Sequence, residues 1–266
     1  MRPAADLDDQ PGIRPEVLVL TCEHGGNRVP ARYRGLFASR RARAALASHR
    51  GHDIGALTVA RALQRRFGVP LVHSTVTRLL VDLNRSVGHA GLFSEFVIDL
   101  SGAERERVLA AHYHPHRVAV EQTVAEHLRH GRCTLHLSVH SFTPRLGGQT
   151  RVADLGLLYD PRRAGEREFC ARWKAALVAG DAGLRVRRNY PYRGKDDGLT
   201  TALRRHFGLA GYLGVELEIN QALLGGAPGD RQRVIRAVAG SLSGLLGGHR
   251  GSRNFTRGRN LAAGPA

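Results

Sequence analysis

Short apolar runs alternate along this chain with longer segments whose apolar residues recur at helical spacing. Such alternation is typical of an α/β fold, in which helices cover both faces of a mainly parallel sheet. The apolar runs predict strands over residues 17–22, 71–76, 79–83, 134–139, 155–159, 185–189 and 212–219. The periodic segments predict helices over residues 30–48, 53–67, 104–130, 166–178, 199–207 and 230–246. We expect a single α/β domain with a mixed, twisted sheet, and a kink or break at Pro115.

The two ends of the chain differ in composition from the region between them. Residues 1–14 are rich in proline and aspartate, and residues 247–266 place arginines among small residues. We therefore expect a mobile leader and a disordered basic tail around one domain at residues 15–246. No run approaches the roughly 18 uncharged apolar residues of a membrane helix, and no apolar stretch near the start resembles a signal peptide. We predict a cytoplasmic protein that does not enter a membrane.

The formal net charge of +17 bears on the partners of the protein. A field of this size attracts anions of every kind, including nucleic acid. The arginines are spread along the whole chain, however, and aromatic residues make up only 6 % of it. This pattern favours a solvated basic surface and a small anionic substrate over a nucleic-acid partner. No feature of the sequence specifies an oligomeric state.

Polar residues directly follow several of the predicted strands. His24 comes just after residues 17–22, and His140 just after residues 134–139. Because open α/β sheets bind ligands beyond the carboxyl ends of their strands, we expect both imidazoles at one site. One such histidine alone would more often be a hydrogen-bonded core residue, but two at strand ends favour ligation of one zinc ion per chain. A catalytic zinc takes three protein ligands and leaves a fourth position for water.

The third zinc ligand has two candidates. Asp53 is preferred over Glu23, although an aspartate directly before a helix is also typical of an N-cap, and the two roles fit equally well. Glu23 adjoins His24, so its side chain tends to point away from a site that His24 enters. We expect Glu23 at the surface or in contact with a metal ligand.

Two carboxylates lie on the last predicted strand. Glu216 and Glu218 are two residues apart, so an alternating strand directs both to the same face. Burying either without a partner is costly, and at least one therefore needs a cation or a role in proton transfer. A general base beside a metal satisfies this need, and a salt bridge to an arginine is the structural alternative.

Two arginines follow one another closely in the segment 77–85. Arg78 and Arg85 carry planar, permanently charged guanidinium groups, which can hold a substrate carboxylate or stabilise a developing oxyanion. Asp82 could hold either arginine in place, and a purely structural arginine–aspartate pair is the alternative interpretation.

Two further features carry less information. The glycines of residues 193–198 predict a flexible loop that could close over a ligand. His112, His114 and His116 alternate within a helical segment, so they do not share one face. We expect these three histidines to be solvated.

Several of these residues lie in longer motifs that together resemble one family. The motifs are TCEHGGNRVP at 21–30, the segment 74–85 ending in DLNR, SVHSFTP at 138–144, NYPYRG at 189–194 and LEINQ at 217–221. In this order, from about residue 15 to 245, they resemble the N-formylglutamate amidohydrolase family. That family is similar in fold to zinc carboxypeptidases and to aspartoacylase. The resemblance therefore implies a mixed sheet of about eight strands flanked by helices.

The resemblance also implies roles for individual residues. By it, His24 and His140 correspond to metal ligands, Arg78 to a carbonyl-polarising arginine and Glu218 to the general base. The substrate-binding candidates are Asn84 and Arg85, which correspond to a carboxylate grip, together with Ser141 and Arg193 from the same motifs. In the carboxypeptidase pattern a glutamate three residues after the first histidine is a ligand. Asn27 stands there in this chain, which leaves the third ligand to Asp53 or Glu23.

The working hypothesis is a zinc hydrolase that cleaves the amide between a small acyl group, formyl by resemblance, and an acidic amino acid such as glutamate. Glu218 would move the proton and Arg78 would stabilise the oxyanion. The alternatives are a zinc deacylase for another N-acyl amino acid or peptide end, and a basic nucleic-acid-binding protein. A thiol amidase using Cys22 is disfavoured, because the adjacent Glu23 does not provide the electropositive setting that activates a thiol.

Overall fold

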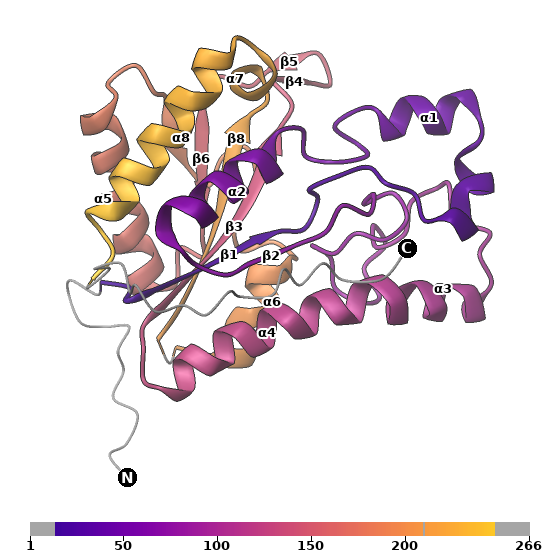
Figure 1. Ribbon diagram of the computed structural model, residues 1–266, viewed down its shortest axis with the longest axis horizontal. Helices are drawn as coiled ribbons and strands as arrows, with labels where there is room; N and C mark the ends of the chain where they lie inside the picture. The colour runs from indigo at the N-terminus through magenta and orange to yellow at the C-terminus, as the bar shows by residue number, and fades with distance from the viewer. Residues whose placement is uncertain (1–13, 210, 248–266) are drawn as a thin grey trace.

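Six of the chain's short extended segments form one mixed sheet, in the order β2-β1-β3-β8-β6-β7 (Figure 1). The strands are β1 (Val17–Cys22), β2 (Leu71–His73), β3 (Thr134–Phe142), β6 (Leu155–Leu158), β7 (Val186–Arg188) and β8 (Tyr212–Asn220). The first four strands of this order are parallel, β6 is antiparallel to β8, and β7 is parallel to β6. This computed structural model describes residues 14–209 and 211–247. Apart from Arg14 and Gly247, the predicted leader and basic tail lie outside these ranges.

The predicted α/β class with a mainly parallel mixed sheet is confirmed, but the sheet has six strands instead of about eight. Strands β4 (Arg145–Leu146) and β5 (Gln149–Thr150) form a separate hairpin. Residues 79–83, predicted as a strand, form turns instead. Their apolar side chains are buried in a second apolar cluster with Phe37 and Val108. Burial in a loop therefore accounts for this apolar run without strand pairing.

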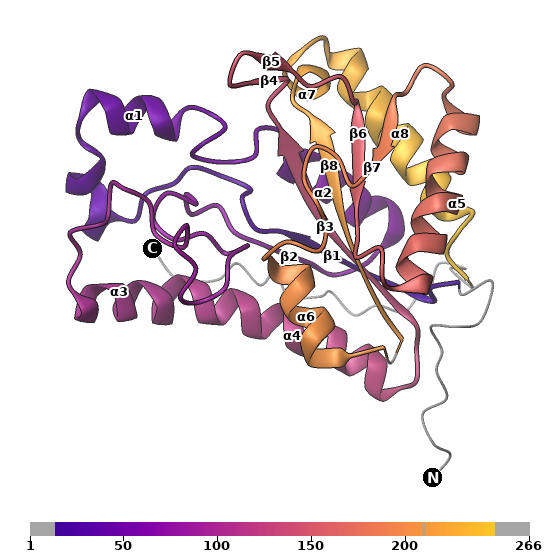
Figure 2. The same cartoon turned by 180° about the vertical axis from the view of Figure 1, so that it is seen from behind.

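Helices cover both faces of the sheet, as predicted (Figures 1 and 2). The α-helices are α1 (Arg40–Leu46), α2 (Ala56–Phe67), α3 (Gly102–Val108), α4 (His114–Arg129), α5 (Ala164–Gly180), α6 (Leu199–Phe207), α7 (Ala222–Gly225) and α8 (Pro228–Ser243). Helices α2, α5 and α8 pack on one face, and α4 and α6 pack on the other. None of the described helices combines the length and the apolar composition that crossing a lipid bilayer requires.

Two predicted helices are interrupted. The segment predicted at 30–48 consists of a 3₁₀ helix (Ala31–Phe37) and α1, which begins after Ser39, whose hydroxyl accepts the N–H of Ala42 (3.1 Å). The break expected at Pro115 is present as a π-helical turn (Leu109–Tyr113) between α3 and α4. Proline has no N–H to donate to the preceding turn, so it is tolerated in the first turn of α4.

The two faces of the sheet carry different side chains. In β3, Leu135, Leu137 and Val139 belong to the large apolar core under α2, α5 and α8. Because side chains alternate along a strand, the intervening polar residues face α4 and α6. In β3 and β8 these polar residues are His136, Ser138, His140, Glu216 and Glu218. A polar stripe therefore runs along this face toward the carboxyl ends of β3 and β8.

A buried ion pair provides hydrogen-bond partners for the backbone of β8 where this strand extends beyond β6. Strand β6 pairs with residues 216–219 only, so Gly214 has no strand partner on that side. Glu166 of α5 accepts the N–H of Gly214 (3.0 Å), and Arg204 of α6 donates to its carbonyl (2.8 Å). The Nε of Arg204 also donates to Glu166 (2.9 Å). The pair thus takes the place of a neighbouring strand and joins the two helix layers through the sheet.

This role predicts that Arg204→Met destabilises the fold. The substitution leaves the buried Glu166 carboxylate with Arg163 (3.2 Å) as its remaining cation among the described residues, and it leaves the Gly214 carbonyl without its side-chain donor. A buried polar group that loses its hydrogen-bond partner costs about 1–3 kcal/mol, and a charged group costs more. Urea unfolding followed by circular dichroism measures the free energy of unfolding of the variant and of the wild type. A loss below about 1 kcal/mol, typical of an exposed pair, would contradict the role.

Candidate metal and catalytic site

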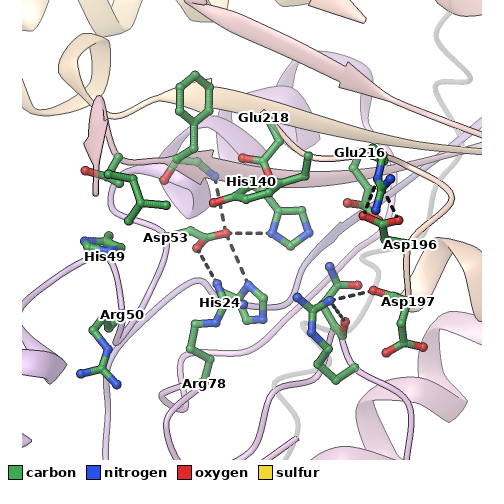
Figure 3. Close-up of a pocket in the computed structure, with 18 of the residues that line it drawn as sticks. His24, His49, Arg50, Asp53, Arg78, His140, Asp196, Asp197, Glu216 and Glu218 are labelled. Atoms are coloured by element: carbon green, nitrogen blue, oxygen red, sulfur yellow. Dashed lines mark hydrogen bonds and ion pairs between the residues drawn. The ribbon is translucent and has the colours of Figure 1, made fainter. Parts of the chain in front are cut away.

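Three of the expected site residues meet beyond the carboxyl ends of β1 and β3 (Figure 3). His24 lies just past the end of β1 and His140 near the end of β3, and parallel pairing of these strands brings the ring centroids to 5.2 Å. Asp53 reaches the same point from the segment before α2, where its backbone N–H donates to the carbonyl of His24 (2.9 Å). All three side chains are buried.

The Asp53 carboxylate connects the two imidazoles. Its Oδ2 accepts a hydrogen bond from Nδ1 of His140 (2.7 Å) and lies 3.4 Å from Nδ1 of His24. One potential ligand atom from each of the three residues lies within 4.8 Å of the other two. The alternative interpretation of Asp53 as an N-cap is wrong, because the N-cap of α2 is Gly55, which has a positive φ of 81°. Asp53 directs its carboxylate to the histidines instead.

The far nitrogen of each imidazole has a carboxylate partner of its own. Nε2 of His24 lies 2.7 Å from Oδ1 of Asp82, and Nε2 of His140 lies 3.0 Å from Oε2 of Glu23. A carboxylate on the far nitrogen of a metal-binding histidine sets which nitrogen faces the metal. Both rings consequently present Nδ1 toward Asp53.

The electrostatics of the cluster are those of ionisable groups buried close together. Burial alone lowers the pKa of His140, but hydrogen bonds to Asp53 and Glu23 outweigh it and hold that pKa well above its ordinary value. Burial likewise opposes ionisation of Asp53, but the two histidines hold the pKa of its carboxyl below the usual range. Nδ1 of His24 is buried and accepts or donates no hydrogen bond among the described residues. A cation placed at this point would satisfy all three groups.

Arg78 lies beside the cluster and is aligned by two carboxylates. Its Nε and NH2 donate to Oδ2 of Asp82 (3.1 and 2.7 Å), and its NH1 lies 3.3 Å from Oδ1 of Asp53. The expectation that Asp82 holds Arg78 is thus met. The guanidinium lines the same cavity as the cluster, and in Figure 3 it lies on the opposite side of Asp53 from Glu218.

Glu218 and Glu216 both face this cavity from β8, as their spacing predicts. Among the described residues, neither carboxylate forms an ion pair with an arginine, so the salt-bridge alternative is wrong. Glu216 accepts a hydrogen bond from the hydroxyl of Thr200 (2.7 Å). Oε2 of Glu218 is buried without a hydrogen bond, and burial, with Asp53 and Glu216 adding to it, raises the pKa of Glu218 to about 8. A carboxyl of this kind can hold or release a proton near neutral pH.

The four expected substrate-binding residues line one cavity of about 370 Å³ with the histidines. Asn84 accepts the first N–H of α6 through Oδ1 (2.6 Å), and the Ser141 hydroxyl donates to the carbonyl of Ile54 (2.9 Å). Arg193 is largely exposed and pairs with Asp196 (3.3 Å).

Arg85 differs from the other arginines of the cavity. It donates to the backbone carbonyls of Asp197 (2.7 Å) and Asn84 (3.2 Å). Within residues 14–209 and 211–247, no carboxylate forms an ion pair with it. Its charge is therefore available to an anionic ligand.

The predicted flexible loop at 193–198 forms one wall of the cavity and is anchored at two points. The Asp197 carboxylate accepts the N–H and the hydroxyl of Ser86 (2.9 and 2.5 Å), and Arg204 donates to the carbonyl of Gly194 (2.6 Å). Sequence reasoning did not single out Asp197 or Tyr192, which also line the cavity. The only sequence signal for Tyr192 is its place in the NYPYRG motif, and for Asp197 its place among the loop glycines.

Two predictions about polar residues near the site need correction. His116, expected to be solvated with His112 and His114, is fully buried and lies 3.6 Å from Glu23. It shares a helical face with Tyr113 and with the buried Val120 and Val124, so spacing by three and four would have identified it. Glu23 is also fully buried, so the surface alternative is wrong and its contact with His140 is the one observed.

Comparisons with known proteins bear on the family and the fold of the chain. The family model described as N-formylglutamate amidohydrolase matches residues 17–224. The crystal structure of the gene product Atu2144 from Agrobacterium tumefaciens is 30 % identical, with a TM-score of 0.72, covering 87 % of this chain and 91 % of that one. The N-formylglutamate amidohydrolase from Ralstonia eutropha JMP134 is 18 % identical, with a TM-score of 0.66, covering 88 % and 96 %. A search of curated proteins found no match.

The buried carboxyl of Glu218 makes a pH-dependent contribution to stability. Because its pKa is raised to about 8 in the folded protein, folding favours the protonated form. This contribution amounts to about 1.4 kcal/mol for each unit by which folding raises the pKa. It is fully present below about pH 4 and is lost as the pH rises through 8. Glu218→Gln does not titrate. In chelator-treated protein, we expect urea unfolding to show the variant gaining stability relative to the wild type between pH 5 and pH 8.5, whereas a constant difference would contradict the burial of an unpaired carboxyl.

Proposed function

Because the chain belongs to the N-formylglutamate amidohydrolase family, we propose that it is a metal-dependent hydrolase that releases formate from N-formylglutamate. The observation that carries this proposal is the convergence of His24, Asp53 and His140 at the wall of a cavity that also presents Glu218 and Arg78. The cavity thus combines a place for a cation, an unpaired carboxyl and an arginine.

The three clustered residues fit a zinc ion. Two imidazole nitrogens and one carboxylate are a common ligand set for catalytic zinc. The orphaned Nδ1 of His24 and the carboxylates behind both rings are what a metal-binding site requires. Zinc held there would supply Lewis acidity and lower the pKa of a water molecule toward neutrality. We propose these three residues as its ligands, with Asp53 and not Glu23 as the third.

Glu218 is the proposed general base and acid. Its buried carboxyl, with a pKa of about 8, takes a proton from the attacking water at Oε2 and returns it to the departing amide nitrogen. Burial serves this role, because a carboxylate in bulk water is too weak a base to hold the proton between the two steps.

Arg78 is the proposed stabiliser of the oxyanion. Asp82 and Asp53 hold the guanidinium on the side of the cluster away from Glu218, so it can donate to the acyl oxygen as negative charge develops there. Arg85, which has no acidic partner among the described residues, and Asn84 would hold a carboxylate of the leaving amino acid. Ser141 and Arg193 line the same cavity and would contact the rest of the substrate.

Two variants test this assignment. Glu218→Gln keeps all three ligands, so it should retain bound zinc while kcat for formate release falls by a factor of about 10²–10⁴. His140→Ala removes a ligand and should lose both metal and activity. Formate release from N-formylglutamate and metal content after dialysis are the two measurements. Wild-type activity in Glu218→Gln, or full activity of the metal-free wild type, would contradict the proposal.

A further inference from the structure

A buried carboxylate lies directly behind His140, outside the cavity. The register of β1 and β3 pairs Thr21 with Ser138, so the position two residues further along β1 comes next to His140. That position is Glu23. Its side chain lies on the same face of the sheet as His140, under helix α4, and it does not line the cavity.

Three side chains contact Glu23, two from β3 and one from α4. Its Oε2 accepts the hydroxyl of Ser138 (2.6 Å) and lies 3.0 Å from Nε2 of His140. Its Oε1 lies 3.6 Å from Nε2 of His116, which α4 contributes. Glu23 and His116 are both fully buried. The line of contacts therefore runs from α4 along this face of the sheet to the ring that faces the cavity.

The fold alone gives no reason for this arrangement. Burying a carboxylate beside an imidazole carries a desolvation cost, and apolar side chains of similar volume often stabilise a core as well or better. The proposed reaction does not use Glu23 either, because no atom of it reaches the cavity. What Glu23 does contact is the far nitrogen of a proposed zinc ligand.

That contact decides which nitrogen of His140 can bind a metal. Both ring nitrogens face acceptors, because Nδ1 donates to Asp53 and Nε2 lies beside Glu23 and the Ser138 hydroxyl. A cation at the site would take the place of the Nδ1 proton. The neutral ring would then keep its one proton on Nε2, where Ser138 and Glu23 accept it, and its lone pair on Nδ1. Nδ1 is the atom that faces Asp53. Asp82 does the same for His24 on the other side of the site.

We propose that Glu23, held by Ser138 and His116, is a positioning residue that fixes the ring and the tautomer of His140 for zinc binding. The inference rests on the proposed metal site but not on the proposed substrate. It adds α4 to the elements on which the site depends.

Zinc affinity in the absence of substrate tests this inference. Competition with a chromophoric chelator gives the Kd of wild type and of Glu23→Gln. Loss of a carboxylate behind a metal-binding histidine weakens metal affinity by roughly 10- to 100-fold, and we expect a loss of this size for Glu23→Gln. The matched control is Glu166→Gln, the other fully buried glutamate within the described ranges, which contacts β8, Arg163 and Arg204 but no proposed ligand. It should lose stability and keep the wild-type Kd.

A second variant tests the same inference if Glu23→Gln does not fold. Ser138→Ala removes the hydroxyl that donates to Oε2 of Glu23 and that lies 2.8 Å from Nε2 of His140, so it breaks the link between Glu23 and the ring. It buries no new charge, and it should also weaken zinc binding. If Glu23→Gln folds and binds zinc as tightly as the wild type, the inference is overturned, but the proposed metal site is not. If Glu23→Gln does not fold, unchanged zinc affinity in Ser138→Ala has the same meaning. A wild type that binds no zinc would overturn the metal site, and this inference with it.

Discussion

The parallel pairing of β1, β3 and β8 is the constraint on which the rest of this structure depends. It brings three carboxyl ends to one edge of the sheet, so that His24, His140 and Glu218 arrive at one place although they are far apart in the sequence. The alternation of side chains then leaves one face apolar for α2, α5 and α8 and places the polar stripe on the other. The site is therefore a continuation of the buried polar face and not an addition to the surface.

The same arrangement explains why the site is rich in paired charges. Each imidazole lies between two carboxylates, and Arg78 bridges Asp53 and Asp82. Burying such a network costs free energy, and removing one member leaves a buried charge without its partner. A bound cation would balance the excess of carboxylates, which is why metal binding and local stability are coupled in this account.

Much of the site could be predicted from the sequence because strand ends are visible in it. Apolar runs followed by His24, His140 and Glu218 indicate where ligands collect in an α/β sheet. The sequence alone could not decide whether Asp53 is a metal ligand or an N-cap, since it does not show whether the helix begins after Asp53 or after Gly55. The strand predicted at 79–83 was wrong, because an apolar run does not distinguish a strand from a loop buried in a second cluster. The partner of Glu23 could not be predicted at all, since it depends on how α4 packs across the sheet.

The most direct test of the central claim is a crystal structure of the zinc-loaded protein with anomalous diffraction at the zinc absorption edge. We expect one strong anomalous peak per chain, coordinated by Nδ1 of His24, Nδ1 of His140 and a carboxylate oxygen of Asp53. A peak bound through either Nε2, a peak elsewhere in the domain, or no peak at this position would contradict it.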